Sequence, residues 1–311
     1  MDFTGGLTFT GGMSVTAQPP PLSYKAIFGY GYNSGYISIT NKVSNTGVVA
    51  TDTAGVGTAR SDISAAGYGT DKALFGYGAI SGGLSSITNL VSNIGVVGND
   101  VTGVGTARSA LAAAGYGSDK AIFGYGTNQS GTYYSMTNLV SNTGVVGNDV
   151  TGVGTARQNL AAATYGTDKA IFGYGMASGG TNVSVTNLVS NTGVVATDTA
   201  GVGTDRRFLA AAGYGTSGQA IFGYGYSTAY GSITNLVSNT GVVATDTAGV
   251  GTARGYLAAA SYSTDKAIFG YGGFPVTSIT NLVSNTGVVA TDTAGVGTAR
   301  YGLGAAIYGG V

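Results

Sequence analysis

Few side chains in this chain can carry acid–base, nucleophilic or metal-binding chemistry. The sequence has no His, Cys, Glu or Trp, so all 13 acidic residues are Asp, and 13 Lys and Arg residues balance them. Without His or Cys, the chain lacks Ser-His, Cys-His and thiolate nucleophiles and the ordinary zinc ligands. A formal net charge of zero gives no general attraction to nucleic acid. We therefore expect no cofactor, no bound metal and no nucleic-acid partner.

An Asp and an Arg recur together at a fixed spacing. In six places an Arg lies eight residues after an Asp and closes the motif Gly-Val-Gly-Thr-Ala-Arg, with Asp replacing Ala in one copy. Rings of like charge could form an anion site or a cation site. A balanced pattern repeated in every copy instead favours structural ion pairs and hydrogen bonds that hold the link between repeats. The residues of these predicted ion pairs are Asp52, Arg60, Asp100, Arg108, Asp149, Arg157, Asp198, Arg206, Asp246, Arg254, Asp292 and Arg300.

Asp62 and Asp205 stand outside the repeated acidic positions and are the remaining candidates for catalysis. A glycosidase needs two carboxylates at a set separation, one of them with a raised pKa. Asp62 and Asp205 lie in different repeats and could face one opening, but two such residues alone make a poor catalytic signature. The Gly-rich motif also lacks the Gly-Lys-Ser/Thr of a phosphate-binding loop. The sequence therefore predicts a protein without enzymatic activity.

The elements that position these residues come from an internal repeat. Phe-Gly-Tyr-Gly begins at Phe28, Phe75, Phe123, Phe172, Phe222 and Phe269, in steps of 47 to 50 residues. Such a period is typical of a propeller or a solenoid. Each unit contains four short apolar runs separated by turn signals, as at 111–116, 120–125, 136–141 and 144–149. We expect each unit to form four antiparallel strands.

The two ends of the repeat region favour a closed ring over a solenoid. The region begins at Tyr24 with the second strand of a unit, and one more first strand follows Arg300 at 303–308. Pairing of 301–308 beside 25–31 would complete the first unit and leave no open edge there. The predicted fold is therefore all-β: a six-bladed β-propeller over 24–311, with four-stranded antiparallel blades and the first blade closed by the C-terminal strand.

This order of motifs resembles the kelch family of repeat proteins. The shared pattern is an Arg, a strand of small apolar residues, a Lys-Ala-Ile-Phe strand, a variable loop, a third strand, a turn and a fourth strand. The chain departs from the usual kelch pattern because it has Gly29-Tyr30-Gly31 in place of adjacent glycines and has no Trp. The resemblance implies the propeller architecture and nothing about partners.

Two segments differ between otherwise similar repeats. One is the loop after Phe-Gly-Tyr-Gly, and the other is the pair of residues after each motif Arg. In a four-stranded up-and-down blade these segments emerge on the same face. They are rich in Tyr among small polar residues, a mixture found in antibody binding sites. We expect this face to bind a cell-surface glycan or protein, although unconstrained drift of exposed loops would also produce variation. The predicted binding residues are Tyr32, Tyr36, Tyr133, Tyr134, Phe208, Tyr226, Tyr230, Tyr256, Phe274 and Tyr301.

Residues 1–23 differ from the repeats and are expected to form an extended docking arm. Phe-Thr-Gly-Gly occurs twice, six residues apart, and three prolines at 19–21 join this segment to the first repeat. Pro-rich segments are extended and semi-rigid, and strand addition to another protein would bury the apolar side chains. The predicted anchoring residues are Phe3, Phe9 and Met13; a disordered tail is the alternative.

The arm is similar to N-terminal segments of structural proteins from marine tailed bacteriophages, and the repeats are similar to kelch-like repeats in such proteins. This resemblance implies a virion component, held by other virion proteins through residues 1–23 and present in many copies. The expected location is the exposed virion surface, hence extracellular after release. The sequence shows no secretory signal and no apolar run of about 18 residues, so no membrane insertion is expected. The alternative is a bacterial extracellular lectin-like adhesin or filament subunit.

Overall fold

The computed structural model describes residues 24–310, which fold into β-strands and one short 3-10 helix. The described strands pair antiparallel and form several small sheets. No helix in this part of the chain is long and apolar enough to cross a membrane. The predicted docking arm at 1–23, with its anchoring residues Phe3, Phe9 and Met13, lies outside the described residues.

Six of the sheets have three strands each. In chain order they are β1 (Tyr24–Tyr32) and β2 (Tyr36–Val43) with β22 (Gly304–Gly309); β3 (Ser64–Tyr68), β4 (Lys72–Gly76) and β7 (Thr88–Val91); β8 (Ala112–Tyr116), β9 (Lys120–Gly124) and β10 (Thr137–Val140); β12 (Ala161–Tyr165), β13 (Lys169–Gly173) and β15 (Thr186–Val189); β16 (Ala210–Tyr214), β17 (Gln219–Tyr226) and β18 (Tyr230–Val237); and β19 (Ala258–Tyr262), β20 (Lys266–Gly270) and β21 (Thr280–Val283). Smaller elements lie in the variable segments: β5 (Ala79–Ile80) with β6 (Gly83–Leu84), β11 (Arg157–Gln158) with β14 (Met176–Ala177), and the 3-10 helix η1 (Ser178–Gly180).

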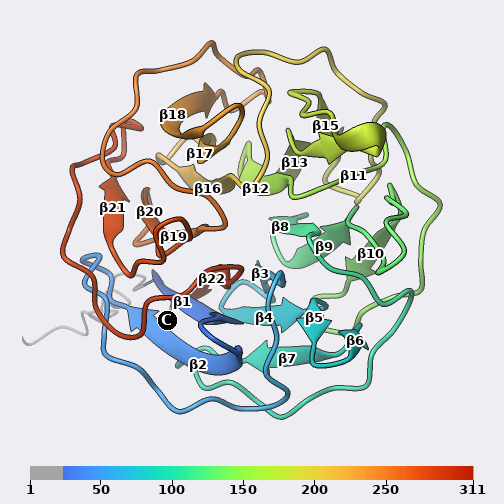
Figure 1. Ribbon diagram of the computed structural model, residues 1–311, viewed down its shortest axis with the longest axis vertical. Helices are drawn as coiled ribbons and strands as arrows, with labels where there is room; N and C mark the ends of the chain where they lie inside the picture. Colours follow the sequence, from blue (N-terminus) through green and yellow to red (C-terminus); the bar gives the residue numbers. More distant parts are fainter. Residues whose placement is uncertain (1–23, 311) are drawn as a thin grey trace, which may run out of the picture.

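The three-stranded sheets surround a common centre (Figure 1). The innermost strand of each sheet contacts the innermost strand of the next, in the closed order β3, β8, β12, β16, β19, β22 and back to β3. Ala, Gly and Ser from these strands line the centre, where larger side chains would crowd each other. The predicted pairing of the chain's last strand with its first is confirmed, because β22 pairs with β1 from Tyr24↔Gly309 to Gly29↔Gly304.

The middle strand of each sheet is buried on both faces. Ala121, Ile122 and Phe123 of β9 have 0% exposure, which explains the continuous apolar run Ala-Ile-Phe where a half-exposed strand would alternate. Phe123 also packs against the preceding sheet, where a Cβ on Gly76 would lie 2.7 Å from its ring. The Phe-Gly-Tyr-Gly motif therefore serves packing between sheets: Gly makes room for the next Phe, and Tyr77 lies against the same ring at 5.0 Å.

The predicted fourth strand is wrong as a continuous strand. Residues 144–150 pair with β10 through isolated bridges, Val140↔Val146 and Thr137↔Val150. Between these bridges, the side chain of Asn138 donates to the carbonyl of Gly147 at 3.0 Å and to Asp149 at 2.9 Å. A side-chain amide thus takes the place of backbone ladder bonds, which is why these sheets have three strands where four were expected.

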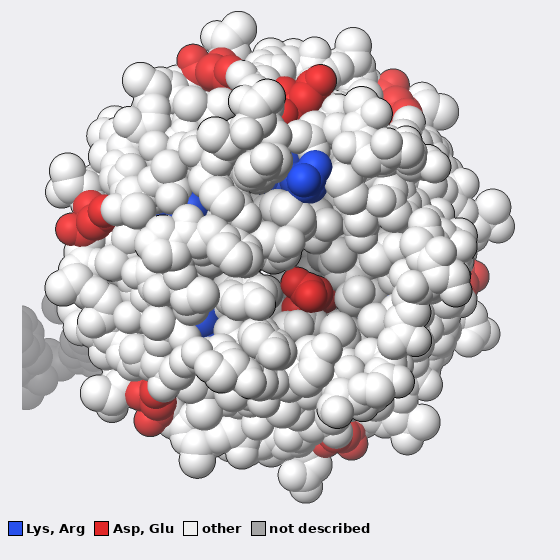
Figure 2. All heavy atoms as spheres, in the orientation of Figure 1, with Lys and Arg blue, Asp and Glu red and all other residues white. Residues whose placement is uncertain are grey.

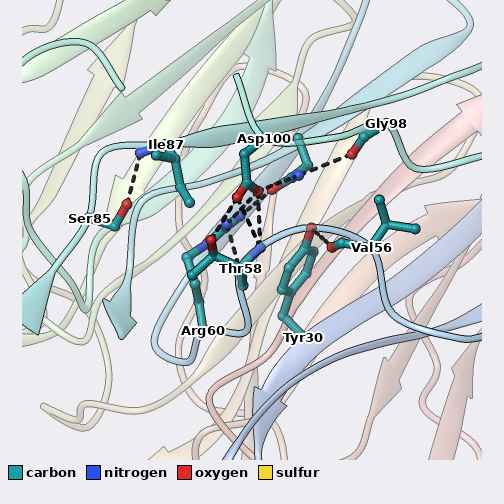
Figure 3. Close-up of polar contacts among 9 residues, drawn as sticks. Tyr30, Val56, Thr58, Arg60, Ser85, Ile87, Gly98 and Asp100 are labelled. Atoms are coloured by element: carbon teal, nitrogen blue, oxygen red, sulfur yellow. Dashed lines mark hydrogen bonds and ion pairs between the residues drawn. The ribbon is translucent and has the colours of Figure 1, made fainter. Parts of the chain in front are cut away.

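A buried arginine links each sheet to the next. Arg60 is 0% exposed and lies over the ring of Tyr30 at 4.6 Å. Its Nη2 donates to Asn89 of the next repeat at 2.7 Å, and its Nη1 donates to the carbonyl of Thr58 at 3.2 Å. Asp100 accepts from the Thr58 hydroxyl at 2.6 Å and from the Asn89 amide at 2.9 Å, so these groups converge in one cluster (Figure 3). The same arrangement of Arg, Tyr and Asn recurs with Arg108, Arg157, Arg206, Arg254 and Arg300.

The predicted ion pairs form in two of the six links, and the structure shows which Asp lies near each Arg. Each Arg approaches the Asp of the following repeat, and not the Asp eight residues before it. The Arg–Asp distance is 3.6 Å for Arg60–Asp100 and 3.9 Å for Arg108–Asp149. In the other four links, Asn connects Arg and Asp by hydrogen bonds, with no Arg–Asp pair within 4.0 Å among residues 24–310; Arg300, Asn41 and Asp52 close the ring in this way. The physical reason is that a carboxylate can be satisfied by Thr and Asn donors as well as by a cation.

These hydrogen bonds also lower the pKa of the six repeated Asp residues. Partial desolvation alone would raise the pKa of Asp100, but hydrogen bonds from Thr58 and Asn89, with the charge of Arg60, outweigh it and hold this pKa below its ordinary value. The same balance lowers the pKa of the five equivalent Asp residues. Because this pKa is lower in the folded state, the ionised carboxylate stabilises the fold at pH values above the unfolded pKa near 3.8. This contribution is lost as the pH falls below that value.

We predict that the buried and the exposed cations differ sharply in importance. Arg108→Met leaves Asn138 and the Tyr125 and Thr106 carbonyls without a donor inside the molecule. It should lower the free energy of unfolding by about 3–5 kcal/mol. Lys120→Met, which breaks only the exposed 2.9 Å pair with Asp119, should change it little. Urea denaturation measures both, and similar losses in the two variants would contradict the link described above.

Candidate recognition surface

The two segments that vary between repeats lie side by side in every repeat. In each case a residue after the motif Arg forms a bridge with the loop after Phe-Gly-Tyr-Gly. The pairs are Ser61 with Ala79, Ser109 with Thr127, β11 with β14, Arg207 with Tyr226, Gly255 with Gly273, and Tyr301 with Tyr32. The two variable segments of each repeat are thus neighbours in the structure.

A closed ring of backbone hydrogen bonds surrounds the end of the central axis on this side. Its members are the second residues after each motif Arg: Asp62, Ala110, Asn159, Phe208, Tyr256 and Gly302. Each has a left-handed φ of 50 to 63°. Each N–H donates to the carbonyl of a neighbouring member at 2.7–3.0 Å, and the ring closes where Asp62 donates to Gly302. These residues rim a depression floored by Ile63 and five Leu side chains.

Eight of the ten predicted binding residues form one aromatic surface that includes two members of this ring, Phe208 and Tyr256. They come from six variable segments and are Tyr32, Tyr36, Phe208, Tyr226, Tyr230, Tyr256, Phe274 and Tyr301. Neighbouring ring centroids in this set lie 3.7–5.9 Å apart. Phe208 and Tyr256 are stacked at 3.7 Å, and Phe274, at 51% exposure, presents the most open ring face.

Tyr133 and Tyr134 do not belong to the aromatic surface. The hydroxyl of Tyr133 accepts from Gln158 at 3.0 Å, and that of Tyr134 accepts from Asn128 at 3.0 Å. Within residues 24–310, neither ring is paired with a ring of the aromatic surface. Their hydrogen bonds instead stabilise the local loop. The sequence analysis grouped them with the other eight only because they lie in an equivalent variable loop.

Asp62 is half-buried and has no charged partner among the described residues. Desolvation raises the pKa of its carboxyl to about 6, opposed by a hydrogen bond from Ser61 at 3.4 Å. No cation of the described chain lies within 4.0 Å of it. Its charge in turn raises the pKa of the Tyr256 and Tyr301 hydroxyls, whose largest cause is desolvation. The carboxyl is therefore electrostatically coupled to the aromatic surface.

Arg207 is the second charged residue of this region, and the sequence did not single it out as a site residue. Its guanidinium lies over the rings of Phe208 at 5.1 Å and Tyr226 at 4.9 Å. Nη1 donates to Asn182 at 2.9 Å, whereas Nε is buried and has no partner within the described residues. Its position directly after the motif Arg206, inside a variable pair, was the available sequence signal.

The charges elsewhere on this molecule are sparse. Figure 2 shows acidic side chains spaced around the rim, a largely uncharged face, and one acidic group beside a central hollow. Asp205, the other catalytic candidate, is exposed on the link before Arg206 and is not among the residues that line the depression with Asp62. Residues 24–310 also contain no group of three or more side chains suited to hold a metal ion.

No protein-family model and no curated protein matches the chain. The function is therefore inferred from the surface itself. The surface presents aromatic rings, one carboxylate and one guanidinium beside a closed ring of backbone hydrogen bonds. Side chains of these kinds can stack on a partner and hydrogen-bond to it.

We predict that Asp62 makes the stability of the protein depend on pH. Its pKa of about 6 exceeds the unfolded value of 3.8, so ionisation is costlier in the folded state, and stability falls as the pH rises through this interval. Asp62→Asn removes this penalty and keeps a residue type that tolerates the left-handed φ. The variant should be more stable than the parent by about 1–2 kcal/mol at pH 7.5 and gain nothing at pH 3.5.

Thermal and urea unfolding at the two pH values measure this difference. Asn159→Ala, at an equivalent ring position without a carboxyl, is the matched control and should have the same effect at both pH values. A stability change in Asp62→Asn that is the same at pH 3.5 and pH 7.5 would show that the carboxyl carries no ionisation penalty.

Proposed function

We propose that the chain is a non-enzymatic virion structural and display protein, with the aromatic surface used for recognition or attachment. We further propose that residues 24–311 form a six-bladed β-propeller. The six three-stranded sheets, the closed contact order of their innermost strands and the pairing of β22 with β1 support that architecture. The proposed location is the exposed surface of the particle, with the chain held there by residues 1–23.

The continuity of the aromatic surface is the observation that carries the recognition proposal. Its rings come from segments as far apart in sequence as Tyr32 and Tyr301, which are 5.6 Å apart. Tyr230 and Phe274 belong to loops of different repeats and stack at 5.6 Å. Loops that varied without constraint would gain polar and charged residues independently of each other. Aromatic side chains that meet across several loops indicate a shared role.

Some of these contacts also stabilise the local structure. Tyr32 and Tyr36 pair across the end of the β1–β2 hairpin, and Tyr226 and Tyr230 pair across the end of the β17–β18 hairpin. Those hairpins extend further than their equivalents in the other sheets. Hairpin stabilisation does not require Phe274, whose ring remains half exposed between Tyr230 and Tyr301.

The virion assignment rests on the resemblance of the arm and the repeats to structural proteins of marine tailed bacteriophages. A display role agrees with a recognition surface made of rigid rings, because many weak contacts act together when copies share one particle. Particle-bound copies would use residues 1–23 to contact other virion proteins. Mass spectrometry of density-purified particles should recover the full chain, and a chain lacking 1–23 should remain in the soluble fraction. Full-length chain that never sediments with particles would overturn the virion assignment.

We predict that attachment depends on the aromatic surface and not on every variable Tyr. The triple variant Tyr230→Ser, Phe274→Ser and Tyr301→Ser removes three joined rings and should reduce binding to host cells at least tenfold, since buried aromatic anchors contribute about 2 kcal/mol each. Labelled purified protein and cells on which the particles multiply provide the assay.

The matched control changes aromatic side chains outside the aromatic surface. Tyr133→Ser with Tyr134→Ser should leave attachment unchanged, while both variants keep the parent circular dichroism spectrum. Attachment that survives the triple variant, or is lost equally in the control, would contradict this use of the surface.

A further inference from the structure

The aromatic surface contains one place where two charged groups flank stacked rings. Phe208 and Tyr256 stack at 3.7 Å, the Arg207 guanidinium lies 5.1 Å from the Phe208 ring, and Asp62 lines the axial depression together with Tyr256. Asp62 and Phe208 also line the same axial depression. This arrangement is called the Asp62–Arg207 site below.

Both charged groups of the Asp62–Arg207 site have unused hydrogen-bonding capacity. Asp62 accepts one long side-chain hydrogen bond of 3.4 Å, although a carboxylate can accept about four. Arg207 makes one side-chain hydrogen bond, to Asn182, and its buried Nε has no partner in the described part of the chain. A buried donor without a partner, such as this Nε, destabilises a protein. A ligand that supplies both a donor and an acceptor would satisfy them.

The charge balance of the site selects the class of ligand. A cationic ligand would gain from Asp62 and be repelled by Arg207, and an anionic ligand would experience the reverse. An apolar peptide would leave both charges desolvated and unpaired, which costs binding free energy. A neutral polyhydroxyl ligand avoids these penalties, because each hydroxyl both donates to a carboxylate and accepts from a guanidinium.

The rings next to these groups favour a ligand with a flat apolar face. The C–H groups on one side of a pyranose ring form such a face, and aromatic rings bury it well. Phe274, with 51% exposure, offers an open ring 5.9 Å from Tyr256. The site thus combines hydroxyl-binding groups with a platform for the hydrocarbon side of a sugar.

We propose that the Asp62–Arg207 site binds a neutral saccharide, with a pyranose ring packed on the aromatic surface at Tyr256 and Phe274. Its hydroxyls donate to the Asp62 carboxylate and accept from the Arg207 guanidinium. This inference rests on the proposed recognition role and adds the class of ligand and the groups that select it.

The test uses the full chain and a defined panel of soluble sugars. Neutral hexasaccharides of α-1,4-glucose, β-1,4-glucose, α-1,6-mannose and β-1,4-N-acetylglucosamine are compared with hexagalacturonate and hexaglucosamine as charged members. Saturation-transfer NMR detects binding, and calorimetry gives affinities. At least one neutral sugar should bind. Asp62→Asn and Arg207→Gln should each weaken that binding tenfold or more, while Tyr133→Ser should leave it unchanged.

Three results would overturn the inference: no neutral sugar binds, a charged sugar binds more tightly than every neutral one, or the Asp62→Asn and Arg207→Gln variants bind like the parent. Failure here can be separated from failure of the recognition role. Suppose that the Tyr230, Phe274 and Tyr301 triple variant loses cell attachment but no neutral sugar binds. If protease treatment of the cells then also removes attachment of the parent protein, the surface recognises a protein. If attachment is unaffected by the triple variant, both proposals are wrong.

Discussion

One buried arginine per repeat holds neighbouring sheets together, and the regularity of the molecule depends on it. A guanidinium with 0–2% exposure needs acceptors inside the molecule, and here they come from the next sheet as well as from its own link, although Nε of Arg60 has no partner among residues 24–310. Arg157, for example, reaches the Tyr174 carbonyl and the Asn187 side chain, each at 2.7–2.8 Å. Changing any of these groups would leave the others unpaired, which explains why this part of the repeat is so uniform.

The architecture could largely be read from the sequence, because its signals are local and repeated. The period, the apolar runs and the extra strand at 303–308 were sufficient to predict antiparallel sheets and the pairing of the two ends. The sequence indicated ion pairs at the links between repeats but did not show which Asp lies near which Arg. Eight extended residues span about 26–29 Å, so Asp100 and Arg108 of one link cannot meet unless the chain turns back. The fourth strand was misassigned because the side chain of Asn138 takes over the backbone's hydrogen bonds.

The recognition surface was only partly predictable, since loop sequences do not specify the direction of side chains. Composition identified the aromatic residues, and eight of them meet. Tyr133 and Tyr134 have the same residue type in an equivalent loop, but Gln158 and Asn128 bind their hydroxyls locally. The proposed joint role of Asp62 and Arg207 was beyond sequence analysis, because these residues lie in different repeats and share no motif.

The backbone ring at the end of the axis has a consequence for how such a protein can diversify. Because N–H and carbonyl groups alone make its bonds, the six positions accept residues as different as Gly, Ala, Asp, Asn, Phe and Tyr. Proline is excluded by the required N–H and the positive φ, and Val, Ile and Thr are disfavoured there. Single substitutions at these positions can therefore change the side chains around the axial depression one at a time while the backbone ring is kept.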